Sequence, residues 1–215
     1  MRAPVAGPGG WAPGAPKACS AQPLEIGPGA ASLVIGIGNP LRGDDGIGWR
    51  LAARLPAQPG LAVRCRQQLT PELAADLAAV QRVLFLDAWL EPWPEDQAAK
   101  ALRYLGSAQS PISVQRPLRL EEIGAPDALG RSTQAWAGAA PWSGASHGLS
   151  PEELLVLGRS LYGHAPRAHQ LLLPAHRFDH GEGISPALAP RLGEARGLIA
   201  GWIAAAWALP DAGHA

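Results

Sequence analysis

Four side chains with the chemistry of metal ligands stand where predicted strands end or where a predicted helix begins. Asp44 and Asp45 lie in the segment GIGNPLRGDDGIG after a short apolar run, Asp87 ends the run RVLFLD, and His147 lies just before a helix-like pattern. In an open parallel sheet, the loops that follow the strands meet at one edge. Two carboxylates and an imidazole from separate loops can bind a borderline divalent metal, such as nickel or zinc, and leave coordination positions open.

The spacing does not decide which of the adjacent Asp44 and Asp45 faces such a site. Neighbours on a helical turn point about 100° apart, so we expect only one of them to do so. Each residue also has a simpler role, because a loop aspartate often accepts hydrogen bonds from nearby backbone N–H groups and a histidine can cap a helix. The metal site is therefore a hypothesis that depends on the fold bringing three loops together.

The order of the elements that must position these side chains predicts an α/β fold. Short apolar runs typical of buried strands alternate with segments of helical spacing. The strands are expected at 32–38, 61–66, 82–88 and 168–175, and the first helices at 46–55 and 70–80. This order implies three layers, in which a twisted, mostly parallel sheet is flanked by helices on both faces.

Capping signals predict where three helices begin. Ser150, followed by Pro151 and by Glu153, forms a capping box, and this helix should end at Gly163. Thr70 is expected to be the N-cap of the second helix. The pair Ser185-Pro186 is expected to open the last helix.

Composition divides the chain into a folded domain and two terminal segments. Residues 1–31 are so rich in Pro, Gly and Ala that we expect a disordered leader, whereas 32–209 should form a single domain and 210–215 a flexible tail. Most of 89–146 is expected to form a long loop insertion over the sheet edge, with a possible strand at 112–115. Its tryptophans fit either a docking surface or ordinary core over that edge; they are Trp89, Trp93, Trp136 and Trp142.

Charge and hydropathy argue against two classes of partner. Lys plus Arg equals Asp plus Glu at 18 each, so no basic surface for nucleic acid is expected. The most apolar window, 197–209, is shorter than the roughly 20 residues of a membrane span, so we expect a buried or partner-facing helix and no membrane insertion. The N-terminal residues lack the apolar core of an export signal, and Cys19 and Cys65 show no framework spacing, which favours reduced thiols in a cytoplasm.

The segment GIGNPLRG also invites comparison with a dinucleotide-binding turn, because two glycines follow a strand and precede a helix. Its third glycine comes late, Pro40 interrupts the turn, and two aspartates stand where a pyrophosphate would bind. Covalent catalysis is disfavoured as well, since the chain has no G-x-S-x-G elbow and neither cysteine has a base that the sequence can place beside it.

Four sequence blocks resemble the maturation endopeptidases of nickel-iron hydrogenases. In chain order, over about 33–205, they are GIGNPLRGDDGIG, FLDA, SHGLSPEELL with LYG, and FDHGEGISPAL. The resemblance implies a metal-guided cut near the C-terminus of a hydrogenase large subunit. It also implies that Asp45, Asp87 and His147 bind metal, with Asp45 as the first candidate for a catalytic base.

The resemblance further implies that the nickel is supplied by the substrate, a nickel-loaded large-subunit precursor, and that the ligands act as a checkpoint for nickel insertion. Zinc or cadmium could occupy the same site in vitro. Asn39 and Thr70 are the candidates for substrate binding. Many members have Glu at the position of Asp45 and a Gly-Gly-Thr-like loop where this chain has RQQLTPEL, a difference that bears on how the substrate tail is held.

Two alternative functions share part of this signal. Peptidyl-tRNA hydrolases carry a similar Gly-x-Gly-Asn-Pro turn, but they need a basic surface and further Tyr and His-Asn elements, which this chain lacks. A nickel-binding chaperone of hydrogenase assembly would use the same ligands without cutting the precursor. Only a measurement of cleavage separates the protease from the chaperone.

Overall fold

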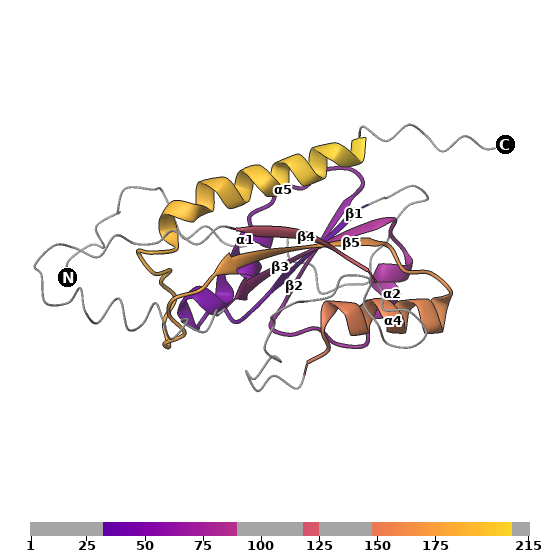
Figure 1. The fold of residues 1–215 in the computed structure, drawn as a ribbon, viewed down its shortest axis with the longest axis horizontal. Helices are drawn as coiled ribbons and strands as arrows, with labels where there is room; N and C mark the ends of the chain where they lie inside the picture. Colours follow the sequence, from indigo (N-terminus) through magenta and orange to yellow (C-terminus); the bar gives the residue numbers. More distant parts are fainter. Residues whose placement is uncertain (1–31, 90–117, 125–147, 208–215) are drawn as a thin grey trace, which may run out of the picture.

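A computed structural model of the chain describes residues 32–89, 118–124 and 148–207, which form a five-stranded sheet with helices on both faces (Figure 1). Several sequence-based expectations lie outside these residues. They are the leader at 1–31, the tail at 210–215, the strand at 112–115, and the residues Trp93, Trp136, Trp142 and His147.

The sheet has the strand order β2-β1-β3-β5-β4, and its first four strands are parallel. The strands are β1 (Ser32–Ile37), β2 (Leu61–Arg66), β3 (Arg82–Trp89), β4 (Arg119–Ile123) and β5 (Arg167–Pro174). Every residue of β1 is buried, as its continuous apolar sequence predicts for a strand covered on both faces. The predicted three-layer, mostly parallel sheet is confirmed.

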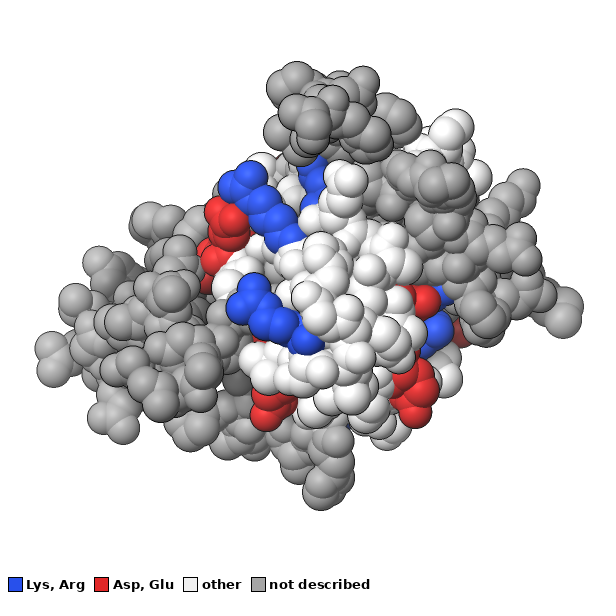
Figure 2. All heavy atoms as spheres, turned by 90° about the vertical axis from the view of Figure 1, so that its right-hand side faces the viewer, with Lys and Arg blue, Asp and Glu red and all other residues white. Residues whose placement is uncertain are grey.

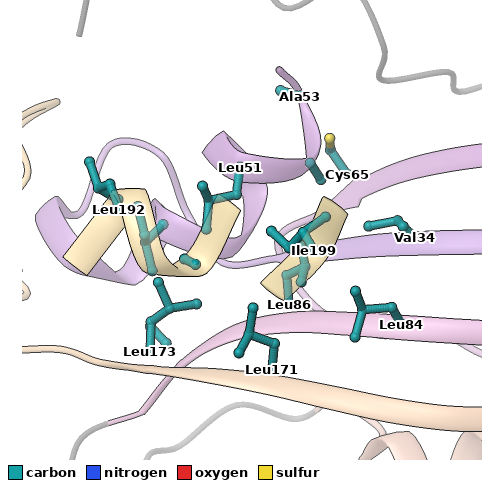
Figure 3. Close-up of a cluster of buried hydrophobic side chains, with 14 of the residues drawn as sticks. Val34, Leu51, Ala53, Cys65, Leu84, Leu86, Leu171, Leu173, Leu192 and Ile199 are labelled. Carbon is teal, nitrogen blue, oxygen red and sulfur yellow. The ribbon is translucent and has the colours of Figure 1, made fainter. Parts of the chain in front are cut away.

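Two apolar clusters hold the helical layers to the sheet. On one face, α1 (Ile47–Ala52) and α5 (Leu192–Trp207) cover side chains of β1, β3 and β5, and Figure 3 shows Leu51 and Ile199 meeting Leu86 and Leu171 there. On the other face, α2 (Leu73–Ala78) and α4 (Pro151–Tyr162) cover the alternate side chains of the same strands. The strands are therefore fixed from both sides, which gives their carboxyl ends a rigid base.

One strand was not expected from the sequence. β4 pairs antiparallel with β5 at the sheet edge, inside the segment that we expected to be a long loop insertion. Its sequence RLEEI contains two glutamates, and Glu122 pairs with Arg167 across the two strands at 2.7 Å. Charged side chains are common on edge strands, because they discourage pairing with other chains. They also remove the apolar pattern that would have revealed the strand.

The helix starts are only partly as predicted. The capping box of α4 is confirmed, with Ser150 N donating to Glu153 Oε2 at 2.7 Å and Glu153 N to Ser150 Oγ at 3.1 Å, and Gly163 ends the helix with a φ of 73°. Thr70 is not the N-cap of α2. That position belongs to Glu72, after a turn in which Leu73 N donates to the carbonyl of Thr70.

The last helix begins later than expected. Ser185 caps only a turn, because its Oγ accepts from Leu188 N at 3.2 Å, and a short 3-10 turn at Ala189–Arg191 separates this turn from α5. Pro190 has no N–H to continue helical bonding from the turn, so regular helix begins at Leu192. Among the described helices, none combines the length and the apolar character that a membrane span requires.

Cys65 lies at the end of β2 in the buried cluster beneath α1 and α5 (Figure 3). It is disulfide-bonded, so the expectation of a reduced thiol is wrong for this residue. The other cysteine of the chain, Cys19, lies outside the described residues.

The surface carries both signs of charge. Figure 2 shows Lys and Arg interspersed with Asp and Glu among uncharged residues on one face of the molecule, with no large region of one sign among the described residues. On this face, the distribution agrees with the formal net charge of zero.

Gly48 lets α1 approach the sheet closely, and substitution there should be costly. A Cβ at this position would lie 2.1 Å from the carbonyl oxygen of Leu86 and 2.7 Å from that of Ile37. We expect Gly48→Ala to lower the free energy of unfolding by about 2 kcal/mol, measured by urea denaturation. Gly193→Ala is the control, since nothing lies within 4 Å of the added atom. An equal cost for both substitutions would contradict this packing.

Candidate metal site at the carboxyl edge of the sheet

The loop after β1 folds tightly back on itself. Gly38 has a φ of 115°, and a Cβ there would lie 1.8 Å from the carbonyl oxygen of Asp45. Asp44 and Asp45 follow in a 3-10 turn at Gly43–Gly46. Gly38 therefore allows close contact within the loop and makes no room for a phosphate, which removes the structural basis for the dinucleotide alternative.

Asp44 is the structural member of the acidic pair. Its side chain is fully buried, and its carboxylate accepts hydrogen bonds from three backbone N–H groups: those of His176 at 2.9 Å, Arg177 at 3.1 Å and Ser185 at 2.7 Å. These amides all belong to the loop after β5. Asp44 thus joins the loop after β1 to a segment more than 130 residues away in sequence, and its lone pairs are committed there.

Backbone bonds reinforce the same junction. Gly181 N donates to the carbonyl of Leu41 at 2.8 Å, and Gly43 N donates to the carbonyl of Gly181 at 2.9 Å. No sequence pattern assigns this role to the segment 176–185, although its block FDHGEG contributes to the family resemblance. The one sequence signal for this junction is the presence of two adjacent aspartates. A single metal ligand from this loop needs only one of them, so the other must have a different role.

Asp45 is the member of the pair that is left for the site. It is partly exposed, and its Oδ2 accepts from the backbone N–H of Asn39 at 2.9 Å. The side-chain oxygen of Asn39 in turn accepts from Leu41 N at 2.9 Å, which fixes the turn. Within the part of the chain that the structure describes, Oδ1 of Asp45 has no hydrogen bond and can accept a proton or a cation.

The Asp87 carboxyl has a raised pKa, to which the charge of Asp45 contributes. The strand β3 continues two residues beyond Asp87, to Trp89. Asp87 therefore does not end the strand, as we expected, but lies near its carboxyl end. Burial, and to a smaller extent the negative charge of Asp45, raise the pKa of the Asp87 carboxyl to about 7, against the hydrogen bond from Ala88 N to Asp87 Oδ1 at 2.7 Å, which lowers it. The two carboxylates therefore repel each other, and a cation between them would relieve that repulsion.

The third predicted ligand, His147, is outside the described residues, so the structure does not place it. Its neighbour Gly148 is described: a Cβ on Gly148 would lie 3.2 Å from Gln68 Cβ, and Leu149 N donates to the carbonyl of Leu69. Both contacts are with the loop after β2, at the carboxyl edge. Over residues 32–89, 118–124 and 148–207, no group of three His, Cys, Asp or Glu side chains is arranged to hold a metal ion.

The two substrate-binding candidates lie at the same edge. Asn39 belongs to the loop after β1, where its side-chain oxygen is used within the turn. Thr70 belongs to the loop after β2, and a hydrogen bond from its side chain to Glu72 lowers the pKa of that carboxyl. Both residues are partly buried, and neither role in substrate binding is tested by these contacts.

Comparison with solved structures identifies the fold. HycI, a [NiFe] hydrogenase maturation protease from Thermococcus kodakarensis, is 18% identical and superposes with a TM-score of 0.50 over 80% of this chain and 91% of its own. The hydrogenase maturating endopeptidase HybD from E. coli is 16% identical, with a TM-score of 0.51 over 79% of this chain and 89% of its own. At these identities the likeness establishes the fold, and it confirms the fold that the sequence resemblance implies.

An endopeptidase from Escherichia coli solved in solution gives a similar result, with 16% identity and a TM-score of 0.50 over 79% of this chain and 89% of its own. No protein-family model matches the chain, and no curated protein does.

Proposed function

We propose that this protein is an endopeptidase that removes the C-terminal extension of a nickel-iron hydrogenase large-subunit precursor after nickel has been inserted. The nickel belongs to the substrate. Asp45, Asp87 and His147 bind it, so that only a loaded precursor is held with its scissile bond at the site. Asn39 and Thr70 flank the bound tail from the loops after β1 and β2.

The observation that carries this proposal is the pairing of Asp45 and Asp87. Burial, with a smaller contribution from the negative charge of Asp45, raises the pKa of Asp87 to about 7, in a fold shared with hydrogenase maturation proteases. Carboxylate oxygens together with an imidazole suit nickel or zinc. Because the carboxylates of Asp45 and Asp87 repel each other, they are also suited to a cation that arrives with the precursor and leaves with the product.

The chemistry of the cut follows from the same residues. A divalent ion held by Asp45, Asp87 and His147 would supply a Lewis acid to polarise the scissile carbonyl or to lower the pKa of an attacking water. Asp45 is the proton acceptor, because the Asn39 amide fixes its Oδ2 and thereby orients Oδ1. Asp44 keeps this loop in place through the amides of His176, Arg177 and Ser185.

The test is to incubate the purified protein with nickel-loaded and with nickel-free large-subunit precursor and to weigh the products by mass spectrometry. We expect a C-terminal peptide to be released from the loaded form only. Equal release from both forms would contradict nickel recognition. Tight binding of the loaded form without any release would favour the chaperone instead of the protease.

A further inference from the structure

Arg50 is a buried cation beside the loop that carries the candidate site. It belongs to α1, and its residue is only 8% exposed. Its guanidinium Nη2 donates a hydrogen bond to the backbone carbonyl of Pro40 at 2.5 Å. Side chains on a helix lean toward its N-terminus, so Arg50 reaches back past the start of α1 to the loop after β1. This one side chain therefore joins the helix to the loop.

Packing alone does not account for an arginine at this position. Burial lowers the pKa of Arg50, while the negative charge of Glu182 raises it. Over the residues that the structure describes, the Nε of Arg50 is buried and has no hydrogen-bond partner. An apolar side chain would fill the same place without these costs. The specific gain from arginine is the hydrogen bond to the carbonyl of Pro40.

That carbonyl belongs to the turn that orients Asp45. Arg42 N donates to the carbonyl of Asn39 at 3.0 Å, which closes a turn with Pro40 as its second residue. The N–H of Asn39 itself donates to Asp45 Oδ2 at 2.9 Å. Because peptide groups are planar, fixing the Pro40 carbonyl restricts the turn and the direction of the Asn39 N–H. Two hydrogen bonds and one tight turn thus lead from Arg50 to the Asp45 carboxylate.

This link is separate from the junction that Asp44 makes. Asp44 and the backbone of Gly181 hold the second half of the loop onto the loop after β5. Arg50 holds the first half of the loop, at Pro40, onto α1. Loss of Arg50 should therefore loosen the turn at Asn39 and leave the amides bound to Asp44 in place.

We propose that Arg50 is a positioning residue for the proposed cleavage. It fixes the Pro40 carbonyl and, through the turn, the Asn39 N–H that orients the carboxylate of Asp45. A carboxylate that binds the ion of the precursor and accepts a proton must be held in one direction, which a supporting side chain ensures. Only the last step, from the orientation of Asp45 to cleavage, rests on the proposed function, because the earlier steps concern contacts within this chain.

The test replaces Arg50 in the full-length protein and measures amide hydrogen exchange by NMR. In Arg50→Met, an unbranched apolar side chain fills the space without a donor. We expect the Asn39 amide to exchange at least about 10-fold faster, because its turn opens locally. The amides of His176 and Ser185, which Asp44 binds, should keep their wild-type rates. A merely structural role would accelerate exchange at all three amides.

Turnover of the nickel-loaded precursor is measured on the same variants. We expect kcat to fall by about 10–100-fold in Arg50→Met, the usual effect of removing a group that supports a metal ligand. Arg50→Lys keeps a charged N–H donor, so both its kcat and its Asn39 exchange rate should lie between those of wild type and Arg50→Met. Arg159→Met, which removes an exposed arginine from α4 on the other face of the sheet, is the matched control and should change neither.

Three results would overturn the proposal. One is unchanged exchange at Asn39 in Arg50→Met, and another is equal acceleration at Asn39, His176 and Ser185. The third is faster exchange at Asn39 with an unchanged kcat, which would remove Arg50 from the reaction. A wild-type protein that does not cleave the loaded precursor would contradict the proposed function instead, and the exchange rates would still decide whether Arg50 holds the turn.

Discussion

Asp87→Asn is expected to abolish cleavage of the loaded precursor and, at the same time, to make the protein more stable at neutral pH. The substitution keeps the shape of the side chain but removes a carboxylate from the proposed ligand set, so turnover should fall by at least about 100-fold. Stability should rise because the negative charge at this position is disfavoured by burial and by Asp45.

The size of this stability gain depends on pH. The pKa of Asp87 is about 7 in the folded protein against 3.8 for an ordinary aspartate. At about pH 4 the carboxyl is protonated in the folded protein and about half ionised in the unfolded chain, and below that pH it becomes protonated in both, so wild type and variant should differ little through this group. Above that pH the unfolded chain ionises first, and the wild type loses stability until the pH passes 7.

Thermal unfolding at pH 4 and at pH 8 checks this prediction. At pH 8 we expect the Asn variant to have a Tm higher by at least about 2–4 °C, which corresponds to roughly 1 kcal/mol for a protein of this size. The difference should nearly vanish at pH 4. A variant that cleaves normally, or one that is less stable than wild type at pH 8, would contradict this account of Asp87.

Asp44→Ala should have the largest effect on stability, although Asp44 is not a proposed ligand. Its removal leaves three backbone N–H groups without their acceptor, and hydrogen bonds to a charged group each contribute about 1.5–3 kcal/mol. Because such contributions are not additive, we expect a loss of about 3 kcal/mol in the free energy of unfolding. Hydrogen exchange in 176–185 should also become faster.

Asp45→Ala is the matched control, since the adjacent carboxylate accepts one backbone bond and is partly exposed. It should cost about 1 kcal/mol or less and should leave exchange in 176–185 unchanged, while cleavage is lost. If Asp44→Ala cost no more than Asp45→Ala, Asp44 would not hold the two loops together.

The sequence predicts the central sheet well because its strands are buried on both faces. Apolar runs such as that of β1 have no competing pattern, and their order in the chain implies parallel pairing. The edge strand β4 could not be predicted in this way, since Glu121 and Glu122 remove the alternation that marks a half-buried strand. Long-range packing against β5, which local pattern does not contain, stabilises it.

The candidate site was predicted to a similar extent. Strand ends indicated Asp87 and the Asp44-Asp45 pair, because carboxyl ends of parallel strands share an edge. The sequence could not show that Asp44 is structural and Asp45 faces the site, because the three backbone amides that bind Asp44 lie 132, 133 and 141 residues away. The prediction that Thr70 is the N-cap of α2 is wrong, because its side chain donates a hydrogen bond to Glu72 and a turn separates Thr70 from the helix.

The measurement that tests the central claim most directly is a crystal structure of the protein soaked with zinc, with the ion located by anomalous scattering. The account predicts one ion with carboxylate oxygens of Asp45 and Asp87 at about 2.0–2.2 Å and a nitrogen of His147 at about 2.0–2.1 Å. An ion bound elsewhere, with these three side chains too far apart to share it, would contradict the account.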